Sequence, residues 1–293
     1  MRGGREAPSI GTARLEKESS LDVLARLHYL QPASPAPVSY ACEPPPGTPW
    51  ESARYEARTV PIADARGTAT SLEREGFELR PAPTRVRRFD DDELRALYDP
   101  ECAELALALT GARRACVFDH QLRRRSASTE LNFGRRRQGL VLNDEAAAAR
   151  VRRHAIVDVW RSIAGPVLDT PLALCDARSV QAAELVAGEV RYARRTGEID
   201  YLGHSPRHRR SYFAAMERDE ALVFKQFDSQ AAGCSRFVPH AAFDLPHVPP
   251  GTPPRARVNR ASAGSASGPR RPRPAGRPAT ATARAAPARC RGP

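Results

Sequence analysis

The chain has 293 residues, of which 41% are hydrophobic, so it is long enough for one large or two small domains with a buried core. Its formal net charge is +12, but ten arginines and no Asp, Glu or Lys fall in residues 251–293, and the other 250 residues carry 36 basic and 34 acidic side chains. A nearly neutral body gives no electrostatic reason to expect a polyanionic partner, which makes nucleic-acid binding by the folded part an unfavoured function.

The cysteines and the hydropathy exclude two further classes of protein. Six cysteines are scattered along the chain without a Cys-x-x-Cys pair, which argues against a zinc site and a disulfide scaffold and fits reduced thiols. No apolar run reaches membrane-spanning length, and the first residues lack the apolar core of a signal peptide. We therefore expect a cytoplasmic protein with no membrane partner.

Residues 1–55 predict an N-terminal arm followed by a proline-rich strap. Apolar side chains at helical spacing in residues 21–30 predict a short helix or docking arm. The prolines that follow, as far as Trp50, exclude a helix interior or a central strand. This part is expected to lie as an extended strap over the surface.

Residues 56–256 contain most of the predicted regular structure. Asp90 and Gly111 bracket a predicted helix that Pro100 divides in two. Strands are predicted at 55–62, 115–120, 155–161, 171–176, 212–216, 221–228 and 236–238, and a second helix at 179–190. Many short strands with irregular connections, and helices mainly early, predict a mainly β protein with flanking helices, of the β-sandwich or jelly-roll type.

Residues 257–293 predict a disordered basic tail. Their Arg, Pro and Ala side chains cannot bury enough apolar surface to fold. A polyanion-binding arm is the alternative interpretation, and it predicts a salt-sensitive affinity that is lost when residues 251–293 are deleted.

Two polar residues at strand-like segments suggest a metal site. The apolar run 139–144 ends in the carboxylate Asp144, and His240 lies in a similar segment nearly a hundred residues later. A carboxylate and a distant His are two parts of a non-haem iron site. The third part, a His two residues before the Asp, would stand at position 142, which is Leu142. Without further context, Asp144 is also typical of a strand-end turn, and His240 of a packed core.

Seven short segments then occur in a characteristic order along the chain. They are residues 64–66 (Asp-Ala-Arg), 72–79 (Leu-Glu-Arg-Glu-Gly-Phe-Glu-Leu), 117–120 (Val-Phe-Asp-His), 159–161 (Val-Trp-Arg), 165–173 (Gly-Pro-Val-Leu-Asp-Thr-Pro-Leu-Ala), 224–229 (Phe-Lys-Gln-Phe-Asp-Ser) and 239–243 (Pro-His-Ala-Ala-Phe). Over roughly residues 22–256, this series resembles the family of the cephamycin 7α-methoxylation components, the AsaB-type hydroxylase/desaturases, gibberellin desaturase and the novofumigatonin endoperoxidase.

The resemblance implies a double-stranded β-helix oxidoreductase of secondary metabolism that hydroxylates or desaturates a small molecule. It implies iron(II) and, as in some members, 2-oxoglutarate as cofactors. The metal ligands carried over are Asp144 and His240, and Arg255 is carried over as the residue that binds the 2-oxoglutarate carboxylate. Leu142 supplies no lone pair in place of the proximal His, and Arg257 stands in place of the usual Ser partner.

The replacement at position 142 leaves the activity open. His120 or His154 is a possible substitute ligand, and Asp158 stands where the family favours Asn before Val-Trp-Arg. The cephamycin relative acts together with a methyltransferase-like protein. The alternative function is therefore a catalytically inactive partner or scaffold for a biosynthetic methyltransferase or another tailoring enzyme.

Overall fold

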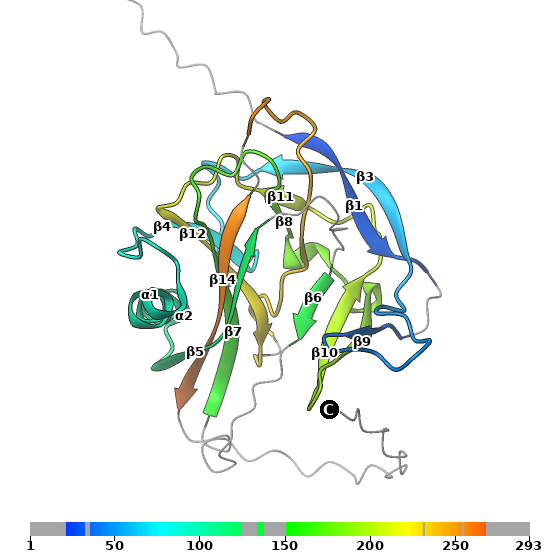
Figure 1. Ribbon diagram of the computed structural model, residues 1–293, viewed down its shortest axis with the longest axis horizontal. Coiled ribbons are helices and arrows are strands. Elements are labelled where there is room, and N and C mark those ends of the chain that lie inside the picture. Colours follow the sequence, from blue (N-terminus) through cyan, green and yellow to red (C-terminus); the bar gives the residue numbers. More distant parts are fainter. Residues whose placement is uncertain are drawn as a thin grey trace, which may run out of the picture.

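The computed structural model describes residues 22–32, 36–124, 134–137, 151–230, 232–252 and 255–267, which form two antiparallel-rich sheets packed face to face (Figure 1). The nine-stranded sheet has the spatial order β1 (Val23–Leu30), β3 (Tyr55–Asp64), β11 (Arg210–Tyr212), β8 (Leu172–Cys175), β13 (His240–Ala242), β6 (Gly134–Arg137), β10 (Thr196–Leu202), β9 (Leu185–Arg191) and β2 (Val38–Tyr40). The five-stranded sheet has the order β4 (Phe77–Pro81), β12 (Glu220–Asp228), β7 (Val151–Ser162), β14 (Ala256–Ser267) and β5 (Arg114–Arg124).

The chain crosses between the two sheets in a regular way. From β5 to β8, and again from β11 to β14, successive strands alternate between the five-stranded and the nine-stranded sheet. Four strands of each sheet (β5, β14, β7 and β12; β11, β8, β13 and β6) thereby wind around a common interior. This is the double-stranded β-helix, or jelly roll, and it confirms the predicted fold class.

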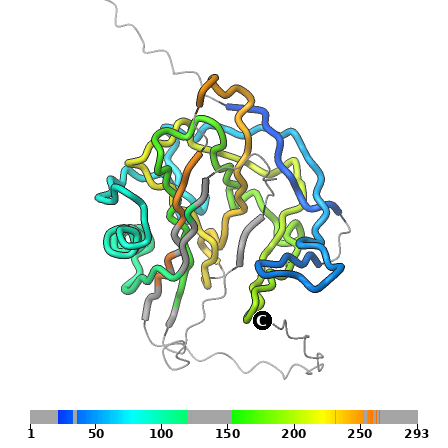
Figure 2. The backbone as a smooth tube through the Cα atoms, viewed as in Figure 1, coloured from blue at the N-terminus to red at the C-terminus, as the bar shows by residue number. Residues whose placement is uncertain are grey.

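Helices cover the outer face of the five-stranded sheet. A short α1 (Asp91–Glu93) leads through a π-helical turn (Leu94–Tyr98) into α2 (Asp99–Thr110), and two 3₁₀ turns lie at Ala177–Ser179 and Ala182–Glu184. The Asp90 side chain accepts from the Glu93 N–H at the start, and Gly111 ends the segment in the left-handed region with φ +64°. The backbone trace shows α1 and α2 on the side away from the nine-stranded sheet (Figure 2), whereas the two 3₁₀ turns connect β8 and β9 of that sheet.

Alternation along the strands separates two apolar layers. Val157 and Val159 of β7 and Val223 of β12 belong to the buried cluster that contains Tyr98 and Ala106 of the helical segment. The residues between them point to the other side, because successive side chains of a strand face opposite ways. These residues form an inner apolar layer between the two sheets, which includes Trp160, Leu222, Phe224, Leu174 and Phe213.

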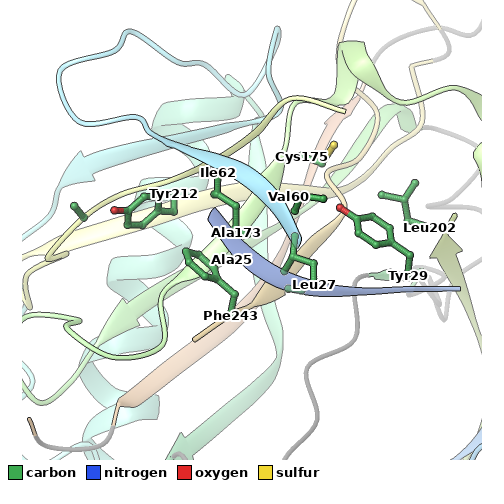
Figure 3. Close-up of a cluster of buried hydrophobic side chains, with 12 residues drawn as sticks. Ala25, Leu27, Tyr29, Val60, Ile62, Ala173, Cys175, Leu202, Tyr212 and Phe243 are labelled. Carbon is green, nitrogen blue, oxygen red and sulfur yellow. The ribbon is translucent and has the colours of Figure 1, made fainter. Parts of the chain in front are cut away.

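A further core lies behind the nine-stranded sheet. A parallel bridge between Leu30 and Gly203 joins the end of β1 to the residue after β10, so the sheet curls back on itself. The curl encloses a third buried cluster, drawn in Figure 3, in which Tyr212 and Phe243 meet edge to face at 5.5 Å.

The prediction of a short N-terminal helix was wrong. Residues 23–30 form β1 and pair with β3 along their whole length, from Val23 opposite Ile62 to Leu30 opposite Tyr55. Ala25, Leu27 and Tyr29 are buried at alternate positions. The same apolar residues fit a helical spacing in isolation, but pairing with β3 selects the alternating pattern.

Several other elements also differ from the sequence predictions. The predicted helix 179–190 consists of 3₁₀ turns followed by β9, which pairs with β10. The predicted strand 212–216 ends at Tyr212, and Ala215 adopts φ +44°. The strands β2, β4, β6 and β10 were not predicted. The predicted strand 236–238 is not a strand, and β13 begins two residues later at His240, whereas the remaining predicted strands have counterparts in the structure.

The predicted tail begins too early, because residues 257–267 are part of β14. This strand pairs with β7 on one side and with β5 on the other. Its sequence is rich in small residues, and at Gly264 this permits close approach, because a Cβ added there would lie 3.0 Å from Ala112 Cβ. Residues 268–293 lie outside the described part of the chain, within which no helix is long and apolar enough to cross a membrane.

Truncation tests the role of β14. Deleting residues 256–293 removes a strand that pairs with both β7 and β5, while the total stability of a domain is typically only about 5–15 kcal/mol. We expect this variant to show no cooperative thermal unfolding by circular dichroism, whereas deletion of residues 268–293 leaves the melting temperature within a few degrees. Cooperative unfolding of both at the same temperature would contradict the assignment of β14.

Candidate functional site

The structure describes only part of the ligand set that the sequence suggested. His240 begins β13, and Arg255 lies directly before β14. Asp144 and Leu142 lie outside the described residues, so their positions relative to His240 stay predictions. His120 lies in β5, but its side chain is likewise outside what the structure describes.

His240 faces the interior between the two sheets. It lies opposite Leu174 of β8, and paired residues of neighbouring strands point to the same face. Leu174 belongs to the inner apolar layer. Its imidazole ring packs against the ring of Phe224, on β12 of the other sheet, with 4.5 Å between the ring centroids.

The imidazole of His240 is held in one tautomer. Its Nδ1 lies 3.0 Å from the Val238 carbonyl oxygen, and since a carbonyl only accepts, Nδ1 donates and Nε2 keeps the lone pair. Burial lowers the pKa of His240 to about 4, the hydrogen bond to Val238 opposes this shift, and the positive charge of Arg257 adds to it. A neutral imidazole with a carbonyl on Nδ1–H is the form in which His ligates metals.

Two arginines lie on the same face of the chain at β14. The Cζ atom of Arg255 is 6.0 Å from the centroid of the Trp160 ring, and its Nη1 donates to the Thr170 carbonyl oxygen at 2.5 Å. Its backbone N–H donates to Asp169 Oδ2 at 3.2 Å. Arg257, two residues further and therefore on the same face, carries the charge that acts on His240. Positive charge thus reaches the interior from β14.

A buried carboxylate ties three neighbouring strands together on this face. Asp158 of β7 is 4% exposed. Its Oδ2 accepts from Gln226 Nε2 of β12 at 2.6 Å and from Asn259 Nδ2 of β14 at 2.9 Å. Sequence reasoning noted Asp158 but missed Gln226 and Asn259, because only strand pairing brings the three together.

The other described histidine proposed as a ligand has a different neighbour. His154 of β7 packs on Phe227, with 5.4 Å between ring centroids, whereas His240 packs on Phe224. Burial lowers the pKa of His154, and the negative charge of Asp228 opposes the shift. Within the described ranges there is no group of three His, Cys, Asp or Glu residues that could hold a metal ion. A complete metal site there would need donors from outside these ranges.

Comparisons with known proteins agree with this architecture. The family described as an oxidoreductase/YMDC permease-like domain matches residues 27–260. A hydroxylase/desaturase of Cercospora beticola is 30% identical over 66% of this chain and 72% of that protein. An Fe(II)/2-oxoglutarate-dependent dioxygenase of Aspergillus novofumigatus is 26% identical over 75% of this chain and 87% of that protein.

Solved structures show the same fold. The iron and α-ketoglutarate-dependent endoperoxidase NvfI superposes with a TM-score of 0.73, over 86% of this chain and 100% of that chain. The two sequences are 20% identical, so this similarity establishes the fold and no more.

Substitutions at Asp158 test the link between the three strands. In Asp158→Ala, the amide N–H groups of Gln226 and Asn259 lose their common acceptor, and a buried donor left in this way costs about 1–3 kcal/mol. Asp158→Asn keeps an oxygen that accepts from both amides, so we expect a smaller loss. Urea unfolding of both variants measures the difference, and equal losses would contradict this role of the carboxylate.

Proposed function

The chain belongs to the oxidoreductase family of the fungal hydroxylase/desaturases, and we therefore propose that it hydroxylates or desaturates a small organic metabolite at a non-haem iron(II) centre. The observation that carries the proposal is the position of His240. Its imidazole faces the interior of a double-stranded β-helix, and the lone pair of Nε2 is available to bind a metal ion. Relatives in this family are named as Fe(II)/2-oxoglutarate-dependent dioxygenases. The metabolite is expected to belong to secondary metabolism.

The donor set of this chain fits iron(II) only in part. His240 supplies an imidazole and Asp144 is the expected carboxylate, while Leu142 replaces the second imidazole by a hydrocarbon. Bound iron(II) supplies the activation of dioxygen that such oxidations need. With two protein donors in place of three, the iron affinity is expected to be weak, since even the loss of a group that only contacts a ligand costs 10–100-fold.

Arg255 is proposed to bind the carboxylate of 2-oxoglutarate. A guanidinium recognises a carboxylate through two parallel hydrogen bonds. The Thr170 carbonyl and the Trp160 ring hold this side chain on the interior face. Arg257 adds a second positive charge on the same face, which further favours an anionic co-substrate.

The inner apolar layer is proposed to exclude water from the reacting centre. Trp160, Leu174 and Phe224 are at most 2% exposed and surround the same interior as His240. Removal of water strengthens every polar interaction inside such a site. Asn259 Oδ1, which is buried and has no hydrogen-bond partner in the described part of the chain, offers an acceptor on this face.

Leu142 also favours a second function, that of a partner without catalysis. A chain that has lost a metal ligand but kept the fold is suited to bind a methyltransferase-like or another tailoring enzyme as a scaffold. Co-purification separates this function from the first. A scaffold is expected to co-purify with such an enzyme equally well as the native chain and as Asp144→Ala.

Restoring the missing imidazole tests the iron site. We expect Leu142→His to bind Fe(II) stoichiometrically under anaerobic conditions, at least 10–100-fold more tightly than the native chain, because a third donor is added. Leu142→Met is the matched control without an imidazole and is expected to bind no better than the native chain. Equilibrium dialysis with metal analysis gives the affinities.

Two results would oppose the proposal. Equally weak binding by Leu142→His and Leu142→Met would mean that position 142 does not lie at an iron site. Tight binding by the native chain that Asp144→Ala and His240→Gln leave unaltered would place the metal elsewhere.

A further inference from the structure

A fully buried lysine lies on β12, close in space to the segment that leads to His240. The chain has only two lysines, Lys17 and Lys225, among 46 basic residues, and Lys225 is 0% exposed. Its Nζ donates to Asp228 Oδ2 at 2.8 Å, to the Ser235 carbonyl oxygen at 2.9 Å and to Glu73 Oε1 at 3.1 Å. These three acceptors match the three N–H donors of an ammonium. The planar, larger guanidinium of an arginine would not fit the same three acceptors in this space.

The charged groups around Lys225 compensate one another. Arg153 donates to both oxygens of Asp228, at 2.6 and 3.0 Å, and to Glu73 at 3.0 Å. Two cations therefore meet two carboxylates. Burial alone would raise the pKa of Asp228, but the hydrogen bonds from Arg153 and Lys225 outweigh it and lower that pKa. The carboxylate is thereby kept charged beside the ammonium.

Lys225 holds residues 235–238 through both its side chain and its backbone. Its ammonium binds the Ser235 carbonyl, and its own carbonyl oxygen accepts from the Val238 N–H at 2.9 Å. Arg236 Nε donates to the Asp228 carbonyl oxygen at 3.1 Å. The pairing of β12 with β7 shifts register between Lys225 and Phe227, a bulge of the kind that redirects a side chain.

A glycine lets a third segment close this junction. Gly76 adopts φ +91°, and its carbonyl oxygen accepts from the Lys225 N–H at 2.9 Å. A Cβ at this position would lie 2.4 Å from both Ser235 Oγ and Val238 Cγ2. Only a glycine therefore allows the loop before β4 to pack against residues 235–238.

The same segment determines the state of His240. The Val238 carbonyl that accepts from His240 Nδ1 belongs to the residue whose N–H is held by Lys225. We propose that Lys225 is a positioning residue for His240: it holds residues 235–238 so that the Val238 carbonyl keeps the imidazole in the Nδ1–H tautomer, with Nε2 facing the barrel interior. The importance of His240 rests on the proposed function, but its tautomer does not.

Nitrogen-15 NMR of histidine-labelled protein tests the proposal without any metal. His240 is identified by the resonances missing from His240→Gln. In the native chain at neutral pH, we expect one tautomer, with Nδ1 protonated and Nε2 not. In Lys225→Met, we expect this preference to fall by tenfold or more, giving a mixture of tautomers. A folded Lys225→Met with an unchanged His240 spectrum overturns the proposal.

Two control variants separate positioning from general loss of stability. Val223→Ala removes buried apolar surface from the same strand on its outer face, and Glu73→Gln removes a half-exposed ion pair while Asp228 and the Ser235 carbonyl stay on Lys225. Both are expected to keep the native His240 tautomer. A change in either control as large as that in Lys225→Met would assign the effect to general destabilisation and overturn the proposal.

A further variant decides the outcome if Lys225→Met does not fold. Gly76→Ala displaces Ser235 and Val238 while every charged group remains. We expect the same loss of the single His240 tautomer, and an unchanged spectrum in this variant overturns the proposal. Failure of Leu142→His to bind iron would leave these spectra unaffected, so the two hypotheses fail separately.

Discussion

The packing of the two sheets across one apolar layer is the constraint on which the rest of the structure depends. Trp160, Phe224 and Leu174 meet in that layer, while Val159 and Val223, which precede Trp160 and Phe224 on their strands, pack under the helices. Because strand side chains alternate, this choice of faces also decides which polar residues reach the interior. His240 and Asp158 lie there for the same reason that Trp160 does, and a slip of β7 by one residue would turn both Asp158 and Trp160 outward.

Polar groups are tolerated in this interior because each has a specific partner. In the interior, Asp158 is held by two amides and the Nδ1–H of His240 by a carbonyl. Lys225, whose side chain lies on the opposite face of β12, is held by three oxygen acceptors. Burial of a charge without such partners costs several kcal/mol, so these contacts are conditions for the fold as well as features of the site. Because Nδ1 of His240 donates to the Val238 carbonyl, Nε2 is the nitrogen that remains for a ligand.

Much of this architecture follows from the sequence, and the exceptions have physical causes. The strands that contain Val60, Trp160 and Phe224 were predictable, because their side chains repeat with the period of a half-buried or fully buried strand. The N-terminal segment was ambiguous, since its apolar residues fit two periods and only pairing with β3 decides between them. The small residues of β14 carry no apolar signal at all. His240 and Arg255 were proposed from the resemblance to a family, and their roles stay predictions, whereas the contact between Asp158, Gln226 and Asn259 requires knowledge of strand order. The positions of Asp144 and Leu142 stay predictions.

The central claim is that His240 supplies a donor to iron from the interior face of the barrel. Nitrogen-15 spectra of histidine-labelled protein, recorded as Fe(II) is added without oxygen, test it most directly. The account predicts that the Nε2 resonance of His240 broadens or shifts first, while those of His154 and His208, which lie against Phe227 and Glu184, stay in place. Paramagnetic broadening at His154 or His208 with the His240 signals unaltered would contradict it.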